Sequence, residues 1–159
     1  MEARLNHVKT WPPALKAMLG LQEVVNSSGL EPQLINLCVL RASQINGCAY
    51  CIDMHTKDLR AADESEQRLY LLPVWREAPF YSDRERAALA WTEAVTNVSA
   101  THVPDEIYQE VRKQLSDEDL VKLTLTIVAI NGWNRFGVAF RLPPGHYQPT
   151  RRTEARRPG

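Results

Sequence analysis

Two cysteines and a histidine lie close together in the segment N-G-C-A-Y-C-I-D-M-H at residues 46–55. The Asn-Gly pair at its start is a strong turn signal, and the absence of glycine and proline from residues 49–62 favours a helix there. At about 100° of rotation per residue, Cys48, Cys51 and His55 share one narrow arc of this helix. Cys51 and His55 are four residues apart, the spacing at which helical side chains touch. The segment therefore predicts a dithiol with an imidazole beside it.

Such an arrangement suits redox chemistry on a thiol. A cysteine reacts as its thiolate, and a free thiol with a pKa of about 8.5 is mostly protonated at neutral pH. A helix N-terminus and a neighbouring histidine both favour the thiolate. Attack on a peroxide oxygen would give a sulfenic acid, which a second thiol condenses to a disulfide. An external dithiol must then reduce that disulfide before the cycle can repeat.

Two other interpretations of the cysteine pair stay open. C-x-x-C also occurs as half of a zinc site, but zinc needs four ligands, and Cys38, His7, His102 and His146 show no ligand spacing. We therefore expect no metal. The pair could also be two inert cysteines buried on a helix face. Cys38 lies in the most apolar segment of the chain, which predicts a small core residue.

The elements that must position these residues are helical in pattern almost throughout the chain. Pro13, Pro32 and Pro104 stand where a first helical turn can begin, and Ser82 with Glu85 forms a capping box. Between these signals the apolar residues recur at helical spacing. We predict one all-α domain over residues 1–145, with helices near residues 13–26, 31–45, 48–62, 66–72, 83–97, 104–115 and 117–139.

Composition and charge exclude several classes of protein. Lys plus Arg and Asp plus Glu both number 19, so the basic excess typical of a nucleic-acid surface is missing. No apolar run approaches the roughly 20 residues of a membrane span, and no apolar leader precedes Trp11. With three cysteines, an odd number, these features lead us to expect a cytoplasmic protein without nucleic-acid or membrane partners. Residues 146–159 carry four arginines against one glutamate and are predicted to form a basic, flexible tail.

Residues 44–55, Q-I-N-G-C-A-Y-C-I-D-M-H, resemble the signature of the alkyl hydroperoxidase D branch of the carboxymuconolactone decarboxylase-like family. Residues 80–96 and 127–144 are similar to the family's later helices, so the resemblance covers most of residues 10–145. It implies an all-α bundle of antiparallel helix hairpins that assembles as a homo-oligomer: a dimer, trimer or hexamer. It also implies an alkyl hydroperoxide reductase that uses a redox-active cysteine pair, a hydroperoxide substrate, a protein or lipoyl dithiol as reductant, and no cofactor.

The resemblance also assigns roles to single residues. By motif position, Cys51 corresponds to the cysteine that attacks the peroxide, Cys48 to the resolving cysteine and His55 to the histidine of the proton relay. Two positions depart from the family pattern. Asn36 stands where the family usually has a glutamate, twelve residues before the first cysteine, and Tyr50 stands where some members have a second histidine. Both side chains can hydrogen-bond, but neither is a good proton acceptor at neutral pH, so we expect slow turnover.

Three further polar residues lie on apolar helical faces. Glu93 lies among Leu89, Ala90 and Ala94, and it is a candidate for the missing carboxylate; the alternative is a surface glutamate at the edge of the apolar stripe. Asn131 and Asn134 share one face of the last helix. Because buried amides need hydrogen-bond partners, we predict that these two asparagines bind neighbouring elements of the fold.

The sequence thus predicts a thiol-dependent peroxidase that reduces alkyl hydroperoxides. One alternative is a redox sensor or a catalytically degenerate binding member of the same family, which the asparagine at position 36 favours. Another is a decarboxylase or lactone-processing enzyme. Members of that branch generally lack the cysteine pair, which speaks against the second alternative.

Overall fold

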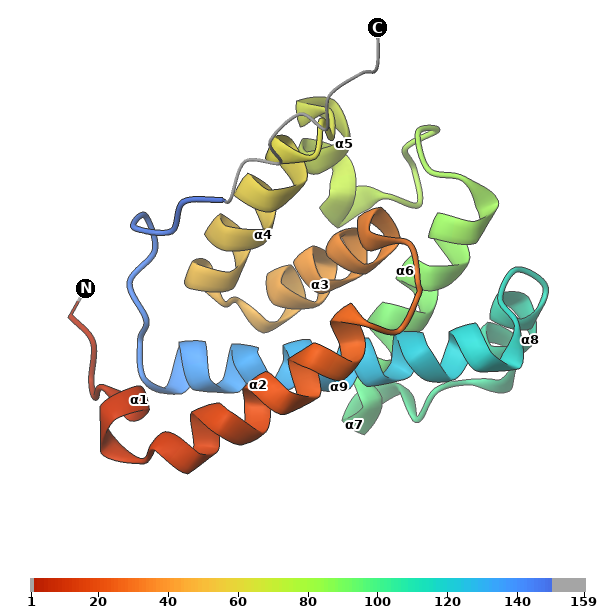
Figure 1. The fold of residues 1–159 in the computed structure, drawn as a ribbon. Coiled ribbons are helices and arrows are strands. Elements are labelled where there is room, and N and C mark those ends of the chain that lie inside the picture. Colours follow the sequence, from red (N-terminus) through yellow and green to blue (C-terminus); the bar gives the residue numbers. More distant parts are fainter. Residues whose placement is uncertain (1, 150–159) are drawn as a thin grey trace, which may run out of the picture.

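The structure, a computed structural model that describes residues 2–149, is built around a central helix, α3. This helix packs against three others, α4, α6 and α9, while α2 lies along α9 (Figure 1). The bounds of these five helices are α2 Pro12–Asn26, α3 Pro32–Asn46, α4 Ala49–Ala61, α6 Asp83–Thr96 and α9 Asp117–Ala139. The site segment at the start of α4 is therefore surrounded by α2, α3 and α9.

Shorter elements complete the bundle: α1 His7–Thr10, α5 Glu66–Leu71, the 3₁₀ turn η1 Leu72–Val74, α7 Val98–Thr101 and α8 Asp105–Arg112. Every helix that the sequence predicts is present, and α8 shows the largest difference in its bounds, since it ends three residues early. The sequence does not predict α1, η1 or α7. Each is only three or four residues long, too short for a helical period to show.

The turn between α3 and α4 forms as the Asn-Gly signal indicates. Gly47 ends α3 in the left-handed conformation, with φ 65°, which glycine adopts without the steric penalty of a Cβ atom. The next residue, Cys48, is already the N-cap of α4, and its sulfur accepts a hydrogen bond from the backbone N–H of Cys51. The two helices thus meet at a two-residue corner, which fixes the cysteine pair at the end of α4.

The core lies on both sides of α3. One cluster fills the space between α3, α6, α8 and α9, with Cys38, Ala88, Trp91, Leu123 and Ile127 among its members. A second fills the space between α3, α4, α5 and α6, with Leu37, Leu40, Leu59, Leu72 and Leu89 among its members. Cys38 is fully buried, and burial raises the pKa of its thiol to about 12. Its prediction as a core residue is confirmed.

After α9 the chain turns and runs beside α4, as the blue segment of Figure 1 shows. We call residues 142–149 the C-terminal strap. Gly145 donates its backbone N–H to Asp53 Oδ2 at 3.0 Å, and Lys57 Nζ donates to the carbonyl of Tyr147 at 3.1 Å. The Tyr147 hydroxyl donates to Asp58 Oδ1 at 2.6 Å. The first four residues of the predicted tail belong to this strap, and its remainder, residues 150–159, lies outside the described part of the chain.

None of the helices within residues 2–149 is both long enough and apolar enough to cross a bilayer.

Candidate active site

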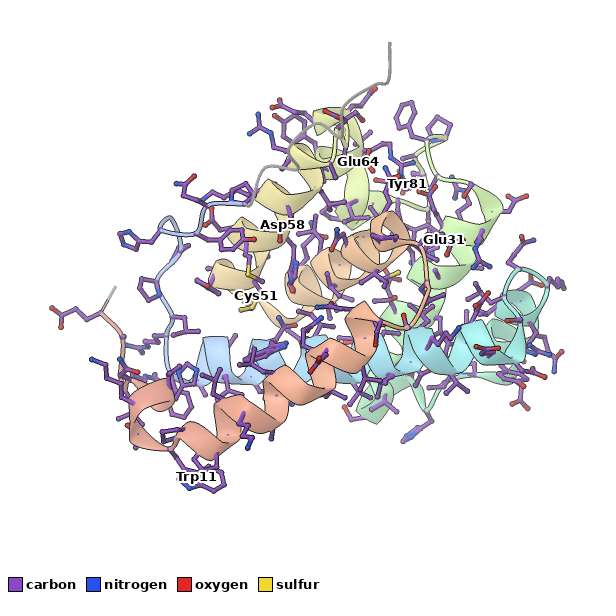
Figure 2. All side chains as sticks on the ribbon, viewed as in Figure 1. Trp11, Glu31, Cys51, Asp58, Glu64 and Tyr81 are labelled. Atoms are coloured by element: carbon purple, nitrogen blue, oxygen red, sulfur yellow. A yellow bond between two sulfur atoms is a disulfide. The ribbon has the colours of Figure 1, made fainter. Side chains whose placement is uncertain are left out.

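The two cysteines of the motif are joined by a disulfide at the N-terminal end of α4. Their Cα atoms are 5.3 Å apart, and the side chains of Cys48 and Cys51 are 1% and 3% exposed. Figure 2 shows the sulfur atoms at the end of α4 that lies beside α9. The positive end of the α4 dipole therefore acts on both sulfurs, which favours a thiolate when the pair is reduced.

A glycine on α9 makes room for the disulfide. A Cβ atom placed on Gly137 would lie 2.6 Å from Cys48 Sγ and 3.5 Å from Cys51 Sγ. The first distance is too short for a non-bonded contact, so α9 can pass this close to the sulfurs only because residue 137 has no side chain. Sequence reasoning missed Gly137, since a glycine inside a long helix gives no indication of what it contacts.

His55 lies one turn after Cys51 on the same helix. Both of its ring nitrogens are buried, and neither has a hydrogen-bond partner within residues 2–149. Burial lowers the pKa of this histidine to about 4, because an imidazolium loses its hydration in the protein interior. At neutral pH His55 is therefore an uncharged imidazole with an available lone pair, and its low pKa makes it a weak proton acceptor.

A cavity of about 390 Å³ lies beside Cys51 and His55. It is enclosed by α2, α3, α4, α9 and Leu142 of the C-terminal strap. Most of its wall is apolar, formed by Ile35, Val39, Met54, Ile130, Trp133 and Leu142. The polar groups on the wall are Gln22, Asn26, Asn36, Tyr50, His55 and Asp58. Mostly apolar walls with a few polar groups are typical of a pocket for a small organic molecule.

The structure brings most of the predicted site residues to this pocket. Cys51, His55, Asn36 and Tyr50 line it, whereas Cys48 lies behind Cys51 against Gly137. Glu93 does not line the pocket. Its carboxylate binds Arg41 Nε at 2.8 Å, Trp75 Nε1 at 2.9 Å and the guanidinium of Arg76. These contacts join α3, α6 and the segment after η1 on another side of α3.

A carboxylate that sequence reasoning did not single out lies in the same pocket. Asp58 is three residues after His55 and seven after Cys51, so the three side chains follow one face of α4. This spacing could have been read from the sequence. The Tyr147 hydroxyl donates to Asp58, and burial together with this carboxylate raises the pKa of Tyr147 to about 12. Within residues 2–149, no group of three His, Cys, Asp or Glu side chains is arranged to hold a metal ion.

A network of asparagine amides, centred on the buried Asn134, fixes the corner between α3 and α4 against α9. Asn46 Nδ2 donates to Asn131 Oδ1 at 3.0 Å and to Asn134 Oδ1 at 2.9 Å. Asn134 Nδ2 in turn donates to Ser43 Oγ at 3.0 Å. The two asparagines on α9 thus bind a neighbouring element, as the sequence predicts, and they hold the cysteine pair next to Gly137.

Substitution of Asn134 by alanine is expected to lower the free energy of unfolding by about 2 kcal/mol, because one N–H of Asn46 loses its acceptor and the buried hydroxyl oxygen of Ser43 loses its donor. Urea unfolding monitored by circular dichroism measures this loss. Asn26→Ala is the matched control, since Asn26 is exposed and should cost less than about 0.5 kcal/mol. Equal losses in the two variants would contradict the role given to the network.

Comparison with known proteins identifies the family. The model of the carboxymuconolactone decarboxylase family matches residues 12–94, which include the cysteine pair and His55. YdfG of Bacillus subtilis, an uncharacterized protein, is 41% identical over 139 residues, which cover 87% of this chain and 95% of that relative. The chain therefore belongs to the carboxymuconolactone decarboxylase family.

Two further relatives place the chain near the AhpD proteins. A solved structure from Agrobacterium tumefaciens, of a protein of unknown function with a suggested role in antioxidant defence as AhpD, has a TM-score of 0.86 and 47% identity. The match covers 94% of this chain and 99% of that one. The alkyl hydroperoxide reductase AhpD of Bradyrhizobium diazoefficiens is 36% identical over 61 residues, 38% of this chain and 31% of that protein. The expected all-α hydroperoxidase D-like fold is confirmed.

Proposed function

We propose that this protein is a thiol-dependent peroxidase that reduces organic hydroperoxides through Cys51 and Cys48. The observation that carries the proposal is the position of Cys51 on the wall of a mostly apolar pocket, beside an uncharged His55. An apolar pocket favours an alkyl or aryl hydroperoxide over hydrogen peroxide, because the organic group removes apolar surface from water. The similarity to an alkyl hydroperoxide reductase supports the same chemistry.

In the reduced protein, His55 accepts the thiol proton of Cys51. The thiolate attacks the terminal oxygen of the hydroperoxide, the O–O bond breaks, and the alkoxide takes up a proton and leaves as an alcohol. Cys51 is then a sulfenic acid. Cys48 attacks its sulfur, the S–O bond breaks, and the hydroxide leaves as water. The products are an alcohol, water and the Cys48–Cys51 disulfide, the state that the structure shows.

An external dithiol, of a protein or a lipoyl group, would return the pair to the reduced state by thiol–disulfide exchange. We further propose that the protein works as a homo-oligomer. Val121 and Val128, which are 70% and 52% exposed on α9, support this, because such apolar side chains gain from burial between subunits.

The proposal is tested by counting free thiols on the reduced protein, by intact mass, before and after one equivalent of cumene hydroperoxide. We expect the loss of two of the three thiols and a mass decrease of about 2 Da, the two hydrogens lost on disulfide formation. Cys51→Ser should abolish the change, whereas Cys38→Ser, which removes the buried free cysteine, should leave it intact. A wild-type protein that loses no thiol over hours would rule out the peroxidase function.

A redox sensor is the second candidate, and the uncharged Asn36 on the pocket wall favours it. A sensor would form the disulfide once but would not turn over. Repeated consumption of hydroperoxide with dihydrolipoamide as reductant separates the two, since only a peroxidase continues beyond one equivalent.

A further inference from the structure

We propose, on the basis of the peroxidase function above, that Asp58 is the carboxylate of the proton relay at this site, and that Tyr147 of the C-terminal strap holds it in place. Asp58 would act through His55, as a positioning residue. The proposal gives the strap a function in catalysis, because the chain beyond α9 then supplies part of the site.

Asp58 lies on the same helix face as the two residues it would assist. Cys51, His55 and Asp58 follow one another along the same face of α4 and all three line the pocket of about 390 Å³. Figure 2 shows Cys51 at the beginning of α4 and Asp58 further along the helix. Within the described chain, Asp58 is the one carboxylate on the wall of this pocket. The ring nitrogens of His55 have no hydrogen-bond partner within the described chain. One nitrogen is therefore available to the thiol of Cys51, and the other is available to a water molecule that links it to Asp58.

Asp58 also lines a neighbouring cavity. This cavity, of about 460 Å³, has Glu31, Gln33 and Pro149 on its wall and shares Asn36 and Asp58 with the pocket. Asp58 therefore stands between the apolar pocket and a more polar space. A proton that leaves the site along water molecules would have a route through this position.

Asp53 and Glu93, unlike Asp58, are bound to cations within the described chain. Asp53 is bound to Lys57 and to the backbone of Gly145, and Glu93 is bound to two arginines. Asp58 has a hydroxyl as its partner and no cation within residues 2–149. A carboxylate that accepts only from a hydroxyl keeps its negative charge available to stabilise an imidazolium. The charge of a carboxylate paired with lysine or arginine is already compensated.

The proton movements balance with Asp58 in this role. When His55 takes the thiol proton it becomes an imidazolium, which the Asp58 carboxylate stabilises through a water molecule in the pocket. The imidazolium then gives its proton to the departing alkoxide. The titratable groups that face Asp58 are His55 and Tyr50 from α4, Tyr147 from the strap, and Glu31 from the N-cap of α3. Glu31 is paired with Arg84, so it adds little charge of its own.

The test compares Asp58→Asn with the wild type in two assays on reduced protein. The first is the second-order rate of disulfide formation with cumene hydroperoxide, and the second is the alkylation of Cys51 by iodoacetamide as a function of pH. For Asp58→Asn we expect the oxidation rate at neutral pH to fall by about 10²-fold. We expect the rise of alkylation with pH to shift to lower pH by about one unit, because the Cys51 thiolate beside an uncharged His55 loses a neighbouring negative charge. The slower oxidation then cannot come from a lack of thiolate.

Matched variants separate a relay from a structural role. Asn36→Glu combined with Asp58→Asn returns a carboxylate to the same two cavities and should recover most of the rate. Glu23→Gln removes an exposed carboxylate of α2 that lies next to the pocket residue Gln22 but outside the pocket, and should leave rate and pH profile unchanged. Tyr147→Phe keeps Asp58 without its hydroxyl partner and should lower the rate less than Asp58→Asn does. It also serves as the test if Asp58→Asn does not fold.

The outcomes distinguish this proposal from the peroxidase function. Asp58→Asn with the wild-type rate and pH profile would overturn the relay. A lower rate without a shift in the alkylation profile, and without recovery in the double variant, would also overturn it, because both readouts require a charge in the pocket. A wild-type protein that resists hydroperoxide but shows an Asp58-dependent alkylation profile would support the relay and overturn the peroxidase.

Discussion

Replacing Gly137 by alanine is expected to make the Cys48–Cys51 disulfide easier to reduce while leaving the reduced protein at least as stable as the wild type. The added Cβ atom would lie 2.6 Å from Cys48 Sγ. In the disulfide this sulfur is bonded to Cys51 and cannot move aside, so either the bond or α9 must shift. In the dithiol the Cys48 side chain is free to rotate away from the methyl group.

Overpacking at a buried site typically costs about 1–3 kcal/mol, and here the cost falls on the oxidised state alone. For a two-electron couple, a cost of about 2 kcal/mol raises the reduction potential by about 40 mV. The reduced state meanwhile gains up to about 1 kcal/mol, since alanine is the better residue in a helix interior. In the variant, the reduced form should therefore be more stable than reduced wild type, and the oxidised form less stable than oxidised wild type.

Equilibration with a glutathione redox buffer measures the potential, and urea unfolding of each redox state measures the two stabilities. Gly132→Ala is the matched control, because it also lies on α9 and its Cβ atom would meet the end of the flexible Met18 side chain at 2.8 Å. It should change the potential little. If Gly137→Ala and Gly132→Ala had the same potential, the close contact between α9 and the disulfide would not constrain the redox pair.

The sequence predicts much of this fold because most of the information is local. Prolines in the first turn and the Ser82 cap mark the starts of helices, and the Asn46–Gly47 turn separates α3 from α4. The helical spacing of apolar residues predicts the remaining helices. The same locality gives the face shared by Cys51 and His55, since both lie within one turn of a single helix. These features depend on residues only a few positions apart, so local sequence patterns are enough to predict them.

The rest of the site depends on contacts between distant segments. Gly137 meets a cysteine that lies 89 positions earlier, and Tyr147 meets Asp58 across the same separation. No local pattern reports such contacts. Glu93 shows the converse: its apolar neighbours indicate an inward face, but two arginines bind it there. The spacing of residues predicts which face of a helix a residue occupies. The tertiary fold decides which partner that residue contacts.

Lowering the pH from 7 to 4 is expected to cost the oxidised protein about 3 kcal/mol of unfolding free energy through His55 alone. Burial lowers the pKa of His55 to about 4 in the folded protein, whereas an unfolded chain has a histidine pKa of about 6.5. Between these values the unfolded state binds more protons than the folded state. The stability that neutral His55 contributes is therefore complete above about pH 6.5 and is lost as the pH falls toward 4.

Urea unfolding of the oxidised wild type and of His55→Gln at the two pH values isolates this contribution, because glutamine does not titrate and the other groups cancel in the difference. We expect the wild type to lose about 3 kcal/mol more than the variant. His146→Gln, which removes an exposed histidine of the strap, should lose as much as the wild type. If His55→Gln were as acid-sensitive as the wild type, His55 would titrate at the same pH in the folded and the unfolded chain, and it would not be a buried neutral imidazole beside Cys51.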